Sequence, residues 1–118
     1  MMKLMSLEFP LNTDIMTTVR LVTGGVCALV GFDLDMSEDC KVCVTESLLL
    51  LLHGGATNVR LSFEKDDALK ISLEGEGSIS GEKSVEEEIS VALLSALVDD
   101  LDIKKEGSLT RISFGMKN

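Results

Sequence analysis

Glu46 lies near the middle of an apolar stretch, Lys41–Gly55, with the sequence KVCVTESLLLLLHGG. A run of five leucines, residues 48–52, begins two residues after Glu46. A carboxylate is costly to bury in such surroundings unless it is hydrogen-bonded or put to use. A carboxylate held there could act as a general base and take a proton from a hydroxyl within hydrogen-bond reach. Glu46 is therefore the first candidate catalytic residue.

Cys40 and Cys43 form a C-x-x-C pair near the start of the same stretch. A redox pair of this kind normally follows a strand in a βαβ unit, whereas FDLDMSED precedes this one. We interpret both thiols as ordinary buried core groups and keep a redox or metal role as the alternative. His53, at the predicted end of the helix, is a favourable cation near the negative end of the helix dipole. We predict no metal site.

Gly75 and Gly77 stand in EGEGSISG, residues 74–81, which we expect to be a glycine-containing loop. Glycines allow a backbone to approach a ligand closely, so this segment could form the rim of a nucleotide site. Short glycine motifs carry little weight alone. The other interpretation is a turn at the end of a strand.

Apolar periodicity and capping residues predict the elements that position these residues. Alternating patterns predict strands at 4–11, 59–63, 69–73, 100–104 and 109–114. Helices are expected at about 12–30, 37–53 and 84–98, with Phe32–Met36 as a connector. The expected N-caps are Asn12 or Thr13 for the first helix, Ser37 for the second, and Ser84 with Glu87 as a capping box for the third.

The expected order, β-α-α-β-β-α-β-β, predicts an α+β two-layer sandwich with three helices on a mixed, mostly antiparallel sheet. In the first helix the apolar face includes Val19, Val26 and Leu29. In the third helix we expect the core-facing residues to be Ile89, Leu93, Leu94 and Leu97. The length of 118 residues suits a single domain spanning residues 1–118.

Composition narrows the classes of partner and compartment. The formal net charge is −9, and there are four Phe but no Trp or Tyr, so neither phosphate binding nor base stacking is favoured. No segment approaches the roughly 20 apolar residues of a membrane span, and no signal peptide is recognised. Three cysteines fit a reducing cytoplasm. We expect a cytoplasmic protein with a basic protein partner.

Several segments together resemble a known family. They are FPLNTDIMTTVRLVTGGV (9–26), DCKVCVTES (39–47), LEGEG (73–77), LLSALVDDLDI (93–103) and LTRISF (109–114). They are similar to the anti-sigma-factor serine kinases of the histidine-kinase-like ATPase superfamily, along nearly the whole chain. The resemblance implies the Bergerat fold and a family that commonly forms homodimers.

The resemblance also implies a site. Glu46 stands where the family has its general base toward a protein serine. Leu50 stands where an asparagine holds magnesium, and a leucine offers that cation no oxygen. Leu73 stands where an aspartate accepts from the adenine amino group. Glu74 is one residue away, which on a strand means the opposite face.

Of the remaining parts of the implied nucleotide site, one is kept and two differ from the family. Gly75 and Gly77 of the nucleotide box are kept. The segment from Gly77 to the third helix, SISGEKS, is shorter than the family's lid. Three carboxylates, residues 86–88, stand where the family's second glycine box would cradle phosphates, and they repel a triphosphate.

We therefore expect an anti-sigma-like regulatory domain that binds protein and has a degenerate ATP and magnesium site, in short a pseudoenzyme. Its partner would be a sigma factor, an anti-anti-sigma domain or a second copy of the chain. One alternative is an active protein serine kinase that uses ATP with Mg²⁺. Another is a different small ligand in a pocket lined by Glu46, Leu50 and Leu73. We expect neither a nucleic-acid nor a membrane partner.

Overall fold

A computed structural model describes residues 2–77 and 84–117 of the chain. A short 3-10 turn, Thr13–Ile15, precedes the first α-helix. The elements are β1 (Met2–Pro10), α1 (Met16–Leu29), α2 (Leu34–His53), β2 (Asn58–Lys65), β3 (Leu69–Glu76), α3 (Val85–Leu97), β4 (Asp99–Glu106) and β5 (Leu109–Met116). The order β-α-α-β-β-α-β-β is confirmed. In the part of the chain described, no helix has the length and apolar character needed to cross a membrane.

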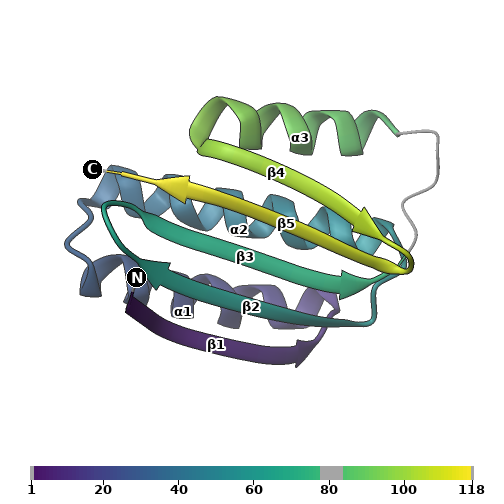
Figure 1. Cartoon of the computed structure of the whole chain (residues 1–118), viewed down its shortest axis with the longest axis horizontal. Helices are drawn as coiled ribbons and strands as arrows, with labels where there is room; N and C mark the ends of the chain where they lie inside the picture. Colours follow the sequence, from purple (N-terminus) through teal and green to yellow (C-terminus); the bar gives the residue numbers. More distant parts are fainter. Residues whose placement is uncertain (1, 78–83, 118) are drawn as a thin grey trace.

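The sheet has the strand order β1-β2-β3-β5-β4, and the three helices lie together on one of its faces (Figure 1). This confirms the α+β two-layer sandwich. The four pairings among the described strands are all antiparallel, so the sheet is more regular than the mixed sheet expected. β1 is an edge strand, as expected from Pro10 at its end.

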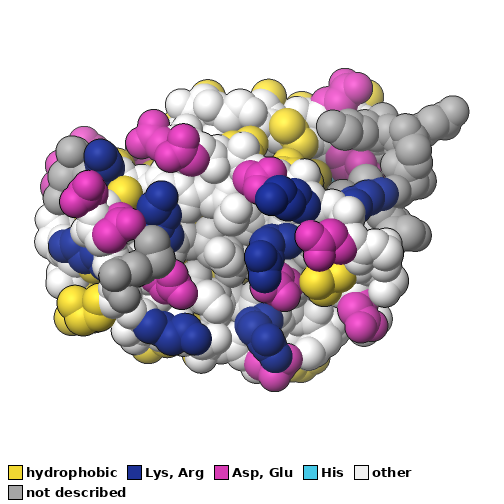
Figure 2. Space-filling model, viewed as in Figure 1, with side chains coloured by type: hydrophobic (Ala, Val, Ile, Leu, Met, Phe, Trp, Pro, Cys, Tyr) yellow, Lys and Arg dark blue, Asp and Glu magenta, His cyan; other side chains and the backbone are white. Residues whose placement is uncertain are grey.

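The core lies between the sheet and the helices. Alternate residues of the central strands are buried on the helix side, since side chains alternate between the faces of a strand. These residues include Val59, Leu61 and Phe63 of β2 and Leu69, Ile71 and Leu73 of β3. The opposite face carries polar and charged side chains of both signs, which Figure 2 shows interspersed across the front of the molecule.

The helix caps bear out one expectation and correct another. Asn12 Oδ1 accepts a hydrogen bond from the Ile15 amide at 3.0 Å, as expected of a cap. The prediction that Ser37 caps the second helix is wrong, because Asp33 Oδ1 accepts from the Met36 amide at 2.8 Å and α2 begins at Leu34. The last three residues of the expected connector, Leu34–Met36, therefore belong to the first turn of α2.

The expected loop at 74–81 is also corrected. Glu74, Gly75 and Glu76 continue β3, because that strand is paired on both sides at this point. Glu74 pairs with Arg60 of β2 and with Arg111 of β5. Residues 78–81 of that loop lie outside the described residues.

The expected inner faces of two helices were partly wrong. In α3, Leu94 is fully buried, but Ile89 and Leu93 are exposed on the other side. In α1, Val19 and Val26 are buried as expected, whereas Leu29 points outward. The buried residues of α3 are Glu87, Ser90 and Leu94, a narrow stripe, because α3 packs mainly on its neighbour α2. Ser84 does cap α3, accepting from the Glu87 amide at 3.2 Å.

Candidate functional site

Glu46 lies on α2 where that helix meets α3. Its Oε2 accepts a hydrogen bond from the Ser90 hydroxyl at 2.6 Å. Hydrogen bonds to an ionised carboxylate are short and strong. The carboxylate in the apolar helix is therefore satisfied by a residue of the neighbouring helix. The geometry is also what a general base requires toward a serine hydroxyl.

Leu50 and Leu73 are part of the hydrophobic core. Leu50, one turn after Glu46, is 4% exposed, and Leu73 is 0% exposed. Leu73 lies between Leu61 of β2 and Ile112 of β5 in the ladder. Neither side chain has an oxygen for a cation or an acceptor for an amino group. In this arrangement neither offers surface to a small ligand.

Gly75 and Gly77 lie where β3 passes the turn that follows α2. A Cβ atom at Gly75 would lie 3.0 Å from Cβ of Ala56. At Gly77 it would lie 2.5 Å from the Gly54 carbonyl oxygen and 2.9 Å from the Ala56 amide nitrogen. Gly77 is thus needed for the backbone to pass close to the chain's own turn, and at Gly75 an added Cβ would be crowded.

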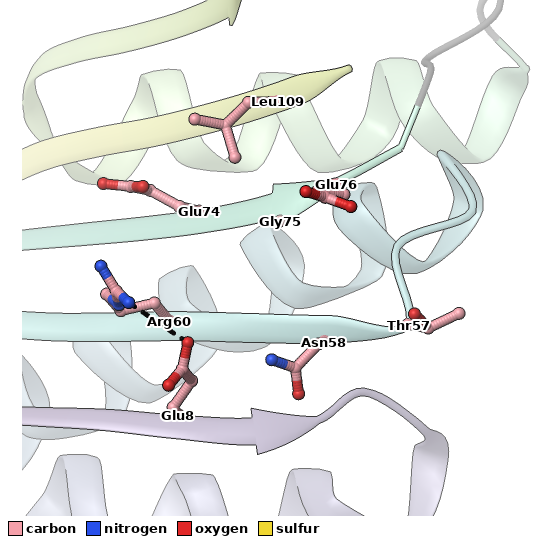
Figure 3. Close-up of a pocket in the computed structure, with 8 residues that line it drawn as sticks. All are labelled: Glu8, Thr57, Asn58, Arg60, Glu74, Gly75, Glu76 and Leu109. Atoms are coloured by element: carbon pink, nitrogen blue, oxygen red, sulfur yellow. Dashed lines mark hydrogen bonds and ion pairs between the residues drawn. The ribbon is translucent and has the colours of Figure 1, made fainter.

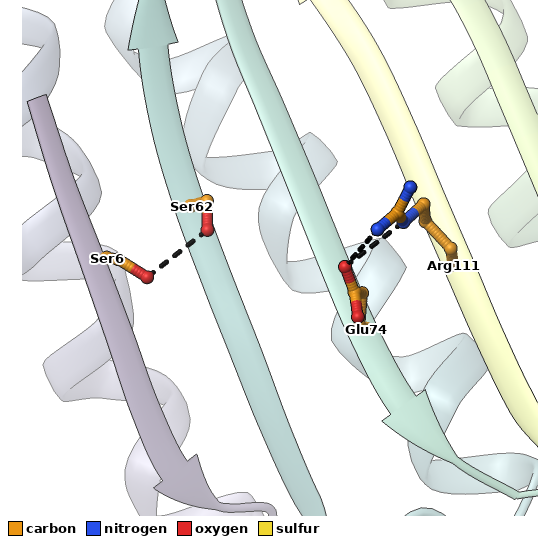
Figure 4. A network of polar contacts seen from close by, with 4 residues as sticks. All are labelled: Ser6, Ser62, Glu74 and Arg111. Atoms are coloured by element: carbon orange, nitrogen blue, oxygen red, sulfur yellow. Dashed lines mark hydrogen bonds and ion pairs between the residues drawn. The ribbon is translucent and has the colours of Figure 1, made fainter. Parts of the chain in front are cut away.

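Glu74 points away from the helices. On the open face of the sheet its carboxylate accepts from Arg111, with Nε at 3.1 Å (Figure 4). The same pairing raises the pKa of the Arg111 guanidinium, chiefly through the hydrogen bond to Glu74. The ladder register is regular on both sides of Glu74, so no bulge turns it inward.

A polar hollow at one end of the open face was not expected from the sequence. It measures about 420 Å³, and Arg60 within it lies 3.3 Å from Glu8 (Figure 3). Its lining residues are Glu8, Thr57, Asn58, Arg60, Glu74, Gly75, Glu76 and Leu109. Three carboxylates face one guanidinium, which does not favour an anionic ligand. Only the strand pairing, which brings residues 8, 60 and 74 into one row, could have revealed it.

The three cysteines are buried and reduced. The thiols of Cys27 and Cys40 hydrogen-bond to each other across α1 and α2, which lowers the pKa of Cys27 and raises that of Cys40. Burial, with the charges of Asp39 and Glu46, raises the pKa of Cys43 to about 12. A reactive cysteine needs exposure as well as a stabilised thiolate.

The remaining candidates form no metal centre. His53 is exposed in the last turn of α2. Within residues 2–77 and 84–117, no three His, Cys, Asp or Glu side chains lie close enough together to hold a metal ion.

Comparison with known proteins supports the fold. No family model matches the sequence, and no curated protein sequence matches it. The structure matches the crystal structure of the RsbU and RsbW domains of Rv1364c from Mycobacterium tuberculosis, with a TM-score of 0.72 and 16% identity. The match covers 97% of this chain and 32% of that chain, so this chain spans about a third of its length. The chain has the histidine-kinase-like ATPase fold, as the sequence resemblance implied.

Proposed function

We propose that the chain is a regulatory, protein-binding domain of the anti-sigma-factor type that keeps the histidine-kinase-like fold and has lost nucleotide chemistry. One observation carries the proposal. The two positions at which the resemblance expects a magnesium ligand and an adenine acceptor are Leu50 and Leu73, and both side chains are packed in the core.

The proposed loss of magnesium binding follows from the side chains present, which offer no oxygen ligand at position 50. Mg²⁺ requires oxygen ligands in near-octahedral geometry, and Leu50 supplies none. The nearest candidate carboxylate on α2, Glu46, already accepts a hydrogen bond from Ser90. A polyphosphate would also meet the three acidic residues in the first turn of α3, Glu86, Glu87 and Glu88, without the cation that normally offsets such repulsion.

The partner is proposed from charge and from the sequence resemblance. With a net charge of −9 the chain favours a partner that presents basic side chains. The resemblance suggests a sigma factor or an anti-anti-sigma domain. A homodimer is part of the same proposal, because α1 exposes the apolar side chains Leu21 and Leu29.

The test is direct binding. The purified chain would be titrated calorimetrically with each purified sigma factor and anti-anti-sigma domain of the source organism, with and without Mg-ATP. We expect one of them to bind with a dissociation constant on the order of micromolar or tighter, unchanged by nucleotide. Absence of any complex, or a complex that forms only with ATP, would refute the proposal.

The second candidate is an active ATP-dependent protein serine kinase with Glu46 as the base. The 2.6 Å contact between Glu46 and the Ser90 hydroxyl favours it, because a base must approach a substrate serine in the same way. Incubation with radiolabelled ATP, Mg²⁺ and an anti-anti-sigma domain tests it. Phosphate transfer that disappears in Glu46→Gln would establish the kinase, and our proposal predicts no transfer.

A further inference from the structure

α3 is apolar on two sides. Its inner side carries Leu94, which is fully buried. Its outer side carries Val85, Ile89 and Leu93, which are 68%, 54% and 37% exposed. These residues follow each other at intervals of four, so they form one line along the helix. With the exposed small residues Ala92 and Ala96 beside them, we call this line the outer stripe.

An apolar stripe on a helix normally faces another element or a partner. α3 is covered on its inner side by α2. In Figure 1, α3 lies at the edge of the helix layer, and no other helix or strand of the described residues lies beyond it. Figure 2 shows apolar side chains along that edge of the molecule. A contiguous exposed apolar surface of this kind marks a binding site.

The outer stripe has acidic borders. Glu86 and Glu88 are exposed, and the helical period places one on each side of the line from Val85 to Leu93. α3 contains no lysine or arginine. The surface is thus a narrow apolar ridge on a helix of 13 residues, with carboxylates on both sides of its first turn.

We propose that the outer stripe docks an amphipathic helix of a protein partner that carries lysine or arginine along the edges of its apolar face. The inference rests on the proposed function and names the surface through which the domain takes its partner. A second helix is the occupant whose shape best matches a straight apolar ridge, since side chains of two helices interdigitate along such lines. Basic flanks on the partner would pair with Glu86 and Glu88.

Charge argues against the two other occupants. A second copy of the chain would bring the same carboxylates and no basic residue on its own α3, with a net charge of −9 on each copy. A membrane surface is anionic, and the two glutamates at the stripe would be repelled by it. Binding of a second copy or of a membrane would require Glu86 and Glu88 to be neutralised first.

The test uses the whole chain and two synthetic probes. One is a helical peptide of about 18 residues of leucine and lysine in amphipathic order, and the other replaces each lysine by glutamate. Binding is measured by fluorescence anisotropy of the labelled peptide, and the contact surface is mapped by amide chemical shifts of the isotope-labelled chain. We expect the lysine peptide to bind and to shift the amides of α3, and the glutamate peptide to bind at least tenfold more weakly.

Three double variants locate the interaction. Ile89→Ser with Leu93→Ser should weaken binding of the lysine peptide at least tenfold. Leu34→Ser with Met5→Ser is the matched control, because these apolar side chains are 75% and 40% exposed yet lie outside the stripe. It should leave binding unchanged. Glu86→Lys with Glu88→Lys should transfer the preference to the glutamate peptide. These positions are exposed, so circular dichroism should show all variants folded.

Several results would overturn the proposal. They are equal loss of binding in the control that changes Leu34 and Met5, shifted amides confined to other elements, or an unchanged preference in the double-lysine variant. A dimer in sedimentation that becomes a monomer in Ile89→Ser with Leu93→Ser would identify a second copy as the occupant instead. If the peptide binds α3 while no sigma factor or anti-anti-sigma domain binds the chain, the surface stands and the proposed function fails.

Discussion

The contacts that α2 makes on its two sides differ in chemistry. Toward α1 they are built from thiols and small groups, with Cys27 hydrogen-bonded to Cys40 and Gly24 against the Lys41 side chain. We call this the thiol seam. Toward α3, Glu46 of α2 accepts from Ser90, next to the buried Glu87 and Leu94. We call these four residues the carboxylate seam.

The difference is that carboxylates lie between α2 and α3, whereas none has been described between α2 and α1. The thiols of the thiol seam are ordinary buried core groups, with a weak hydrogen bond between them. The carboxylate seam holds one carboxylate with a partner, and a second, Glu87, whose Oε2 is buried and has no hydrogen-bond partner among residues 2–77 and 84–117. Buried polar groups of this kind gather at functional sites, where they cost stability. The carboxylate seam contains Glu46, the residue to which the resemblance assigns catalysis.

The largest expected effect is at Leu94, the buried apolar anchor of α3. Leu94→Ala should lower the free energy of unfolding by about 3 kcal/mol, because it removes a buried side chain and leaves a cavity. Leu93→Ala, at the preceding residue, is the matched control. It should lower the free energy of unfolding by less than about 1 kcal/mol, since Leu93 faces solvent. Urea unfolding measures both. Equal costs would mean that α3 packs in a different orientation.

The next effect concerns the thiols of α2. The folded pKa of Cys43 is about 12, above the ordinary value, so the fold favours the neutral thiol. The stabilisation is complete below the unfolded pKa of about 8.5 and is lost as the pH rises toward the folded value. Between about pH 7.5 and pH 10, the free energy of unfolding should fall by about 2 kcal/mol through this group.

Two variants sharpen this prediction. In Cys43→Ala the loss of stability with rising pH should be smaller by about the same 2 kcal/mol, although its stability at neutral pH is lower. Ser90→Ala, in the carboxylate seam, should keep the wild-type dependence on alkaline pH. An unchanged alkaline slope in Cys43→Ala would show that the thiol titrates normally in the folded chain.

A smaller effect is expected at Ser90. Ser90→Ala removes the hydrogen bond to Glu46 and should cost about 1.5 kcal/mol, because the acceptor is charged. Ser95→Ala on the exposed side of α3 is its control and should be neutral or slightly stabilising, since alanine has the higher helix propensity. Thermal and urea unfolding should agree. A neutral Ser90→Ala would show that water replaces the hydroxyl at no cost.

The smallest effect is a gain at Glu87. Replacing this carboxylate by an apolar side chain of similar volume, Glu87→Leu, should raise the free energy of unfolding by about 1 kcal/mol. The cap on α3 should remain, because Ser84 accepts from the backbone amide of residue 87. Glu86→Leu, at an exposed position, is the control and should change stability little. Destabilisation by Glu87→Leu would mean that this carboxylate has a partner in solution.

Local patterns in the sequence were enough to predict the order of elements and the position of Glu74. The alternation of β3 alone predicts that Glu74 and Leu73 face opposite sides, and the structure bears this out. Asp33 and Ser37 are both good caps, so composition could not choose between them. β3 continues three residues into the expected loop, to Glu76, because pairing with β2 and β5 outweighs the local preference of its glycine.

Other features depended on contacts between distant segments. α3 has two apolar sides, and periodicity cannot say which one meets the core, so Ile89 and Leu93 were assigned inward. Ser90 as the partner of Glu46 lies 44 residues away in the sequence, and no local pattern connects them. The same holds for the hollow on the open face, whose lining comes mainly from the four strands β1, β2, β3 and β5.

The central claim is that the fold is kept while the nucleotide site is filled by core side chains. The most direct test is thermal unfolding of the purified chain with and without millimolar Mg-ATP and Mg-ADP. A ligand at about 100 times its dissociation constant stabilises a protein by about 2.7 kcal/mol, which moves the midpoint of a domain of this size by several degrees. We predict no shift with either nucleotide. A shift of several degrees that requires magnesium would contradict the claim and would favour the working kinase.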